Sequence, residues 1–266
     1  MRPLRRGHRT RARSFARKRN PGAGRGRHAL TALANLAQRY ELTADQLRQL
    51  EALLDCVAGD PEAPTTVTDR AGIIRDHLAD SLVALDLPVV RAAATIADLG
   101  SGAGFPGLPL AIALPAAGVS CVESNGRKCA FIARAAEACG AGNATAVHAR
   151  AEEWTAGLGA CDLVTARALA PLAVVAEYAA PLLSMAGSLV AWRGRRDPDD
   201  EESGARAAAE LGLEPGAVIR VEPYPGALHR HLHVIRKVAS TPDRFPRRPG
   251  MARKRPLGRA SDRPRR

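Results

Sequence analysis

Aromatic residues are scarce in this 266-residue chain, at 3% of the sequence, and no run of 18 consecutive apolar residues occurs. The most apolar stretch, residues 168–192, contains Glu177 and two prolines, so we expect no membrane span. The total hydrophobic content of 46% still suffices for a sizeable core, which argues against a wholly disordered protein. That core must be built mainly from alanine, leucine, valine and isoleucine.

Paired cysteines are also lacking. The five cysteines are irregularly spaced and form no Cys-x-x-Cys pair, which argues for reduced, buried thiols in a cytoplasmic protein. His229, His231 and His233 alternate along the chain without a fourth ligand, so we expect no metal site. No apolar segment follows the arginine-rich N-terminus, so we expect no secretion signal. The cysteines are Cys56, Cys121, Cys129, Cys139 and Cys161.

Acidic residues are nearly absent from both ends of the chain. Residues 1–28 carry eleven lysines or arginines and no acid, and residues 244–266 carry ten and one acid. The remaining residues, 29–243, hold 18 basic and 26 acidic residues, a net charge of −8. We therefore expect solvated basic ends that attract polyanions such as nucleic acid. For residues 1–28, a solubilising extension or a wrongly assigned start is an equal alternative.

Charge and hydrophobic periodicity predict four parts of the chain. We expect residues 1–28 to form a basic disordered arm, residues 29–93 a helical N-terminal layer, residues 94–238 an α/β domain and residues 239–266 a basic C-terminal tail. Strands alternate with helices in the third part, which predicts a mostly parallel, doubly wound sheet with one antiparallel edge strand. The predicted helices of the layer are 28–40, 43–57 (with a capping box at its start) and 69–87. The predicted strands are 95–99, 119–122, 144–148, 162–165, 187–192, 218–221 and 231–237, with an acidic loop at 197–202 and a helix at 205–211.

A glycine-rich turn follows the first predicted strand, in the stretch T-I-A-D-L-G-S-G-A-G-F-P-G-L-P that starts at Thr95. Gly102-x-Gly104-x-x-Gly107 matches the dinucleotide fingerprint, and Glu123 ends the next strand, where a ribose-binding acid is expected. No Gly-Lys-Ser/Thr follows, so the turn is not a P-loop. The turn therefore approaches a ligand closely, and a dinucleotide is one candidate.

Asp98 changes this interpretation, because it stands before Gly100 and gives D-x-G-x-G-x-G. We expect its carboxylate to face the ligand, where it would repel a pyrophosphate and suit a cationic amino-acid group. S-adenosylmethionine carries an ammonium and a sulfonium but no phosphate. The residues thus favour a methyltransferase over a dinucleotide-dependent oxidoreductase, which stays the alternative, with Glu123 accepting hydrogen bonds from both ribose hydroxyls.

Four motifs together resemble the ribosomal RNA small subunit methyltransferase G family, also called the glucose-inhibited division protein B family. They are D-L-G-S-G-A-G-F-P-G-L-P-L-A-I, C-V-E-S-N-G-R-K-C-A-F-I, H-A-R-A-E-E-W and D-L-V-T-A-R-A. The Phe-Pro-Gly-hydrophobic-Pro continuation is more specific than the glycines. R-D-H-L-A-D-S-L upstream, and H-R-H-L-H-V-I-R-K and T-P-D-R-F-P-R-R-P-G downstream, extend the resemblance over about residues 65–255.

The resemblance implies a Rossmann-like S-adenosylmethionine-dependent methyltransferase fold and transfer of a methyl group to N7 of a guanine in 16S ribosomal RNA. The substrate would be naked RNA or a small-subunit particle, and we expect a monomer. The implied cofactor-binding residues are Asp98, Gly100, Gly102, Gly104, Phe105, Glu123, Ala151, Glu152 and Arg167. Glu123 would hold the ribose, Ala151 and Glu152 the adenine edge, and Arg167 the methyl-donor side. The candidates for RNA phosphate contact are Arg127, Lys128 and Arg193.

Guanine N7 is a nucleophile without a proton, so this reaction needs positioning and no general base, and we expect no catalytic acid or base. A structural ion pair is the alternative role for Arg167, and a hydrogen-bonded structural role is preferred for His77. The chain departs from the family at Ala63-Pro64, before Thr65, where the family has Asn-Leu, and at Asp76, where it has arginine. These departures concern RNA specificity, and a methyltransferase for another substrate stays an alternative. The basic ends leave a non-catalytic RNA-binding or ribosome-assembly protein as a further alternative.

Overall fold

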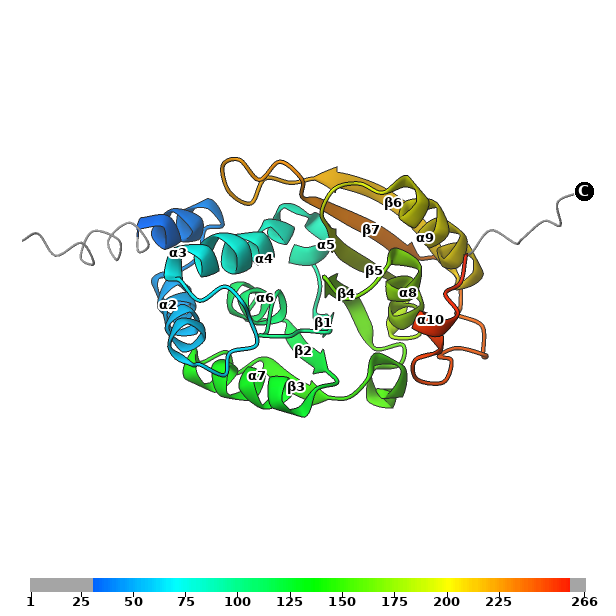
Figure 1. The fold of residues 1–266 in the computed structure, drawn as a ribbon, viewed down its shortest axis with the longest axis horizontal. Helices are drawn as coiled ribbons and strands as arrows, with labels where there is room; N and C mark the ends of the chain where they lie inside the picture. Colours follow the sequence, from blue (N-terminus) through cyan, green and yellow to red (C-terminus); the bar gives the residue numbers. More distant parts are fainter. Residues whose placement is uncertain (1–30, 259–266) are drawn as a thin grey trace, which may run out of the picture.

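A central sheet organises the protein, whose computed structural model describes residues 31–258 (Figure 1). The predicted arm of residues 1–28 lies outside this range. Within it, seven strands pair in the order β3-β2-β1-β4-β5-β7-β6. Strands from β3 to β5 are parallel, whereas β7 is antiparallel to both of its neighbours. The strands are β1 (Thr95–Leu99), β2 (Gly118–Glu123), β3 (Ala144–His148), β4 (Cys161–Arg167), β5 (Leu183–Arg193), β6 (Leu213–Arg220) and β7 (His231–Lys237).

This topology confirms the predicted mostly parallel sheet with an antiparallel edge. The reversed strand is β7, and β6 lies outside it as the outermost strand. From β1 the chain adds β2 and β3 on one side and then returns to add β4 on the other. Such a switch point leaves a crevice beyond the carboxyl ends of the two central strands, where open α/β sheets bind their ligands.

Two hydrophobic cores cover the two faces of the sheet. Neighbouring residues of β1 point to opposite faces, so Ile96 belongs to one core and Ala97 to the other. The first core contains buried residues of the N-terminal helices, α6 (Gly107–Ala113) and α7 (Gly126–Ala138). The second contains those of α8 (Leu172–Ala179) and α9 (Pro198–Glu210). No helix among residues 31–258 is long and apolar enough to cross a membrane.

The N-terminal layer begins with a helix over residues 31–39 and continues with α2 (Ala44–Gly59). The predicted capping box starts α2: Thr43 Oγ1 accepts a hydrogen bond from the Gln46 amide (3.2 Å), and the Thr43 amide donates to Gln46 Oε1 (2.8 Å). The buried face of α2 carries Leu50, Leu53, Leu54 and Val57, which join the first core. The layer thus docks on the sheet through aliphatic side chains.

The third predicted helix exists as a helical run whose winding changes along its length. After α3 (Arg70–Ile73) comes a π-helical turn (Ile74–Ala79), then α4 (Asp80–Leu82) and a 3-10 turn (Val83–Asp86). A separate short helix, α5 (Pro88–Arg91), follows. The π-helical turn adds a residue to one turn, so the side chains on either side of it face differently than in a regular helix.

The predicted acidic loop at residues 197–202 is wrong, because these residues form the start of α9. Asp197 caps the helix by accepting hydrogen bonds from the amides of Asp199 (3.1 Å) and Asp200 (3.3 Å). Pro198 occupies the first helical position, where its missing amide is harmless. The acidic side chains of the first turn also suit the positive end of the helix dipole. The predicted helix at 205–211 is therefore the second half of a longer one.

The expectation of a solvated basic tail is wrong for residues 239–258, which we call the C-terminal strap. The strap contains α10 (Met251–Lys254), next to α8 in Figure 1. Its Phe245 and Ala252 are buried in the second core. Arg247 forms an ion pair with Glu177 of α8 through both carboxylate oxygens. The apolar residues scattered between the cations thus anchor a segment whose charge alone suggested exposure.

Breaking the ion pair between Arg247 and Glu177 should destabilise the fold, because the remaining partner would be a half-buried or buried charge without compensation. We expect Glu177→Gln to lower the free energy of unfolding by about 3 kcal/mol in urea titrations. As a matched control, Arg48→Gln breaks an exposed pair with Asp45 and should cost less than about 1 kcal/mol. Equal, small effects of both substitutions would contradict an anchoring role for the strap.

Candidate functional site

The glycine loop (Gly100–Gly104) joins β1 to α6 at the switch point of the sheet. Gly100, Gly102 and Gly104 have φ values of +67°, +62° and +89°, which other residues rarely adopt. The loop backbone therefore follows a path that strongly favours glycine at three positions, directly beside the crevice.

The carboxylate of Asp98 lies beneath this loop and is fully buried. It accepts hydrogen bonds from the Ser101 hydroxyl, from Thr165 Oγ1 (2.9 Å) and from the Gly107 amide (3.0 Å). Burial raises the pKa of Asp98, while these three donors act in the opposite direction. The expectation that the Asp98 carboxylate faces the ligand is therefore wrong: it ties the loop to α6 and β4 from below.

The N-terminus of α6 has no amide left for a phosphate. Pro106 and Pro109 carry no N–H, the Gly107 amide donates to Asp98, and the Leu108 amide donates back to the glycine loop (2.8 Å). Dinucleotide-binding folds place a pyrophosphate on these very amides. The geometry of this turn therefore disfavours a dinucleotide, although its amino-acid sequence matches the dinucleotide-binding fingerprint.

Glu123 ends β2 beside the glycine loop, as predicted from the sequence. Its buried side chain accepts a hydrogen bond from the Gly102 amide at Oε2 (3.1 Å) and from the Asn125 amide at Oε1 (2.9 Å). Each carboxylate oxygen has two lone pairs, so both keep capacity for one further donor. Glu123 is thus held in place by the backbone and can still accept hydrogen bonds from two hydroxyl groups. Its ribose contact stays a prediction.

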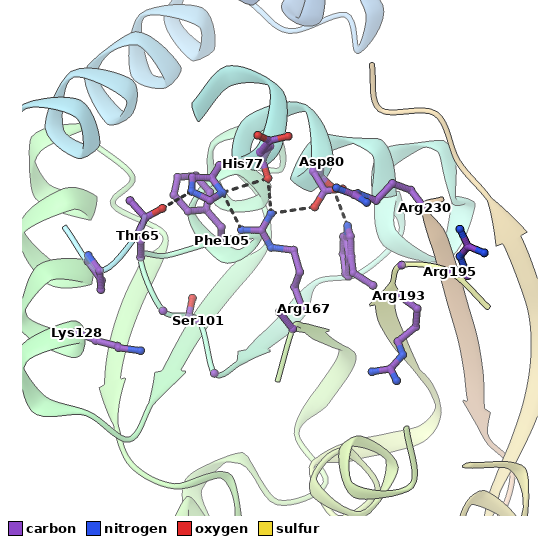
Figure 2. Close-up of a pocket in the computed structure, with 18 of the residues that line it drawn as sticks. Thr65, His77, Asp80, Ser101, Phe105, Lys128, Arg167, Arg193, Arg195 and Arg230 are labelled. Carbon is purple, nitrogen blue, oxygen red and sulfur yellow. Dashed lines mark hydrogen bonds and ion pairs between the residues drawn. The ribbon is translucent and has the colours of Figure 1, made fainter. Parts of the chain in front are cut away.

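A pocket of about 660 Å³ opens beside the loop, at the carboxyl edge of the sheet (Figure 2). The glycine loop forms part of its lining, together with the π-helical turn, the ends of β4 and β5, and single residues such as Thr65, Lys128 and Arg230. Charged side chains dominate the polar lining. The cations are Lys128, Arg167, Arg193, Arg195 and Arg230, and the acids are Asp76, Asp80 and Asp197.

Arg167, at the end of β4, connects the sheet to the π-helical turn. Its Nη1 donates to the Asp76 carbonyl (2.9 Å) and to Asp80 Oδ2 (2.9 Å), and its Nη2 lies 3.3 Å from His77 Nδ1 (Figure 2). Asp80 Oδ1 lies 3.3 Å from Nε of Arg230, so one buried carboxylate faces two guanidinium groups. Arg167 therefore forms the structural ion pair considered as its alternative role and lines the pocket as well.

The imidazole of His77 is held on three sides within the pocket wall. Its Nε2 lies 2.7 Å from Thr65 Oγ1, its Nδ1 lies 3.1 Å from the Asp76 carbonyl, and its ring stacks on Phe105 at a centroid distance of 4.7 Å. Burial and the neighbouring Arg167 lower the pKa of His77, so the neutral imidazole is favoured. The predicted hydrogen bonding of His77 is confirmed, and the ring in addition lines the pocket.

The predicted RNA-contact residues differ in their surroundings. Lys128 is exposed and lines the pocket, but Arg127 is not among the residues that line it. Arg193 also lines the pocket, but its guanidinium forms an ion pair with Asp200 and donates to the Ala170 carbonyl (2.8 Å). Lys128 and Arg193 therefore line the same pocket. The guanidinium of Arg193 is held by Asp200 and Ala170, whereas Lys128 is exposed.

The predicted adenine-edge residues lie outside the lining of this pocket. Ala151 and Glu152 belong to a short 3-10 helix after β3 (η3, Ala151–Glu153). Glu152 Oε1 accepts a hydrogen bond from the Gly250 amide of the C-terminal strap (3.0 Å). The adenine contacts of these two residues stay predictions.

Several pocket residues received no role from the sequence, among them Thr65, Asp80, Trp192 and Arg230. Trp192 Nε1 donates to the Asp80 carbonyl (2.7 Å), which joins β5 to α4. Asp80 follows His77 by three residues within R-D-H-L-A-D-S-L, so a helical spacing already placed the two side chains near each other. Arg230 lies after a turn-rich segment without periodicity, and no local pattern could have identified it.

The alternating histidines have different surroundings in the structure. His231 Nδ1 lies 2.8 Å from the Gly194 carbonyl, and His233 is buried in β7. Across residues 31–258, no group of three or more histidine, cysteine, aspartate or glutamate side chains is arranged to hold a metal ion.

The lowered pKa of His77 makes stability depend on pH. Below about pH 6.5 the unfolded chain binds a proton at this residue more readily than the folded one, so stability is lost as the pH falls. We expect the free energy of unfolding, measured in urea between pH 7 and pH 5, to fall less steeply for His77→Gln than for the wild type. Parallel profiles for the two proteins would contradict a neutral, buried His77.

Comparisons with known proteins agree with this geometry. The model of the family "rRNA small subunit methyltransferase G" matches residues 33–229. Ribosomal RNA small subunit methyltransferase G from Chloroflexus aggregans is 41% identical over 81% of this chain and 92% of its own length, and that of a Roseiflexus species is 43% identical over 85% and 98%. A SAM-dependent methyltransferase structure from Aquifex aeolicus shares the fold, with a TM-score of 0.50 and 14% identity over 63% of this chain and 93% of its own. The chain belongs to the rRNA small subunit methyltransferase G family.

Proposed function

We propose that this protein transfers a methyl group from S-adenosylmethionine to N7 of a guanine in 16S ribosomal RNA. The observation that carries the proposal is a glycine loop whose helix offers no amide to a phosphate and which opens onto a pocket lined by cations. A phosphate-free nucleoside cofactor suits the loop, and a polyanionic substrate suits the pocket. Family membership supports the same assignment.

The residues around the loop fit the cofactor. A Cβ added at Gly102 would meet no atom closer than the Gly100 carbonyl oxygen, at 3.9 Å, so open space faces this part of the loop. Glu123 keeps one free lone pair on each carboxylate oxygen for the two ribose hydroxyls. When bound, S-adenosylmethionine supplies an electrophilic methyl group on a sulfonium. We propose that Gly100, Gly102 and Phe105 line the methionine side.

The residues of the pocket suit a reaction without proton transfer. Guanine N7 has an in-plane lone pair and no proton, so orientation of the base suffices. His77 is fixed by its contacts and favoured as neutral, and Arg167 is fixed by Asp80. Arg167 is thereby oriented toward the pocket as a hydrogen-bond donor for guanine O6 or for the cofactor.

We further propose that the protein acts as a monomer in the cytoplasm, on RNA or on a small-subunit particle. The five cysteines, all within the described part of the chain, are free thiols, which supports a reducing compartment.

Calorimetric titration with S-adenosylmethionine and with NADH tests the cofactor, and methyl transfer to unmethylated 16S ribosomal RNA tests the reaction. We expect binding of S-adenosylmethionine, no binding of NADH, and one methyl group per RNA at a guanine N7. Absence of S-adenosylmethionine binding would overturn the proposal. Binding without transfer to RNA or particle would favour a ribosome-assembly factor, and transfer at another atom would reassign the substrate.

The role of Glu123 is tested by two substitutions. Glu123→Ala removes both acceptor oxygens and should weaken S-adenosylmethionine binding by about 1–3 kcal/mol, which is roughly 5- to 150-fold. Glu123→Gln keeps one oxygen and should have an intermediate effect. Because Glu123 also accepts from the Gly102 and Asn125 amides, urea unfolding of both variants controls for loss of structure. Unchanged affinity in a folded Ala variant would exclude the ribose contact.

A further inference from the structure

Half of the arginines and lysines in residues 31–258 form an ion pair with an acidic neighbour. Nine exposed cations are different, because their side chains form no hydrogen bond or ion pair with any residue in the range 31–258. Such charges repel one another and are free to meet an external anion. These unpaired cations are Arg127, Lys128, Arg150, Arg195, Arg220, Arg236, Arg248, Lys254 and Arg255.

Five of the unpaired cations follow the carboxyl ends of strands. Arg127 and Lys128 begin α7 after β2, Arg150 follows β3, and Arg195 follows β5. Arg220 ends β6, which runs in the same direction as β5 because both are antiparallel to β7. All five therefore lie at the edge of the sheet that carries the pocket, and Lys128 and Arg195 line the pocket itself.

The C-terminal strap brings further unpaired cations to this edge. The Gly250 amide donates to Glu152 Oε1 (3.0 Å), just after β3, and Arg253 Nη2 donates to the Leu169 carbonyl (2.9 Å), just after β4. Arg248 and Lys254 flank these two anchor points. Arg236 is the exception, because it pairs with Ser188 in the middle of β5, away from the carboxyl edge.

The chemistry of this edge fits a sugar-phosphate backbone. Its cations are spread over several separate segments, which suits an extended polyanion more than a compact anion. The exposed large hydrophobic residues of residues 31–258 are Leu158, Met185, Leu228 and Val238, none of them aromatic. Contacts between the cations of this edge and phosphates would read charge and not sequence.

We propose that the C-terminal strap and Arg150 form an RNA-binding track that continues from the pocket. The RNA strand next to the target guanine leaves the pocket at Lys128, passes Arg150, and contacts Arg248 and Lys254 through its phosphates. This inference rests on the proposed function for the identity of the polyanion. It assigns to the strap a second role besides its packing on α8.

The test is removal of two charges from the strap with the double substitution Arg248→Gln and Lys254→Gln. The matched control is Arg236→Gln with Arg48→Gln, which removes two exposed charges elsewhere. Binding to unmethylated 16S ribosomal RNA is measured over a series of salt concentrations, together with S-adenosylmethionine affinity and the kinetics of methyl transfer. All variants carry exposed substitutions, and urea unfolding verifies that they fold.

We expect the strap variant to bind RNA about tenfold more weakly at 0.1 M salt, with a smaller slope of log K against log salt by about 1.4. Its KM for RNA should rise while kcat and cofactor affinity stay unchanged, and the control should match the wild type. The track would be overturned by an unchanged slope of log K against log salt in the strap variant. An equal loss of RNA affinity in the control, or a loss of S-adenosylmethionine affinity in the strap variant, would also overturn it. Failure of the proposed function is distinguishable, because the wild type would then transfer no methyl group.

Discussion

The buried carboxylate of Asp98 is the constraint on which the rest of the site depends. A fully buried charge is costly unless donors surround it, and here Ser101, Thr165 and Gly107 supply them. These bonds fix the glycine loop, orient the start of α6 and tie both to β4. They also use the amide that a phosphate would need. The hydrogen bonds of Asp98 thus fix the loop and at the same time disfavour phosphate-containing ligands, which helix N-termini after glycine-rich loops commonly bind.

A second interaction joins the N-terminal layer to the sheet. Asp80 faces Arg167 and Arg230 through its carboxylate, and its carbonyl accepts from Trp192 Nε1. Elsewhere the layer rests on the α/β domain by aliphatic packing and by polar contacts such as that of Gln46 Nε2 with the Ile112 carbonyl (2.9 Å). The polar contacts of Asp80 make the π-helical turn part of the pocket. The pocket is therefore shared between the N-terminal layer and the α/β domain.

Features that depend on neighbours in sequence were predictable. The capping box at Thr43, the first strand, the glycine turn and the position of Glu123 follow from local pattern, and the structure has them. Features that depend on distant partners were not. One of the three donors that hold Asp98 is Thr165, 67 residues away, and the strap is anchored by Glu177, 70 residues from Arg247. The change to a π-helical turn has no signature in apolar spacing, so the neighbourhood of His77 and Arg167 could not be foreseen.

The contacts that anchor the C-terminal strap can form only late during synthesis of the chain. Domains assemble as the chain emerges, N-terminal residues first. The glycine loop, Glu123 and Arg167 can all be in place once β5 has paired with β4. The contacts at Glu152 and Leu169 come only with Gly250 and Arg253, near the end of the described chain. A nascent chain of this protein can therefore complete the contacts at Glu152 and Leu169 only after Gly250 and Arg253 have been made.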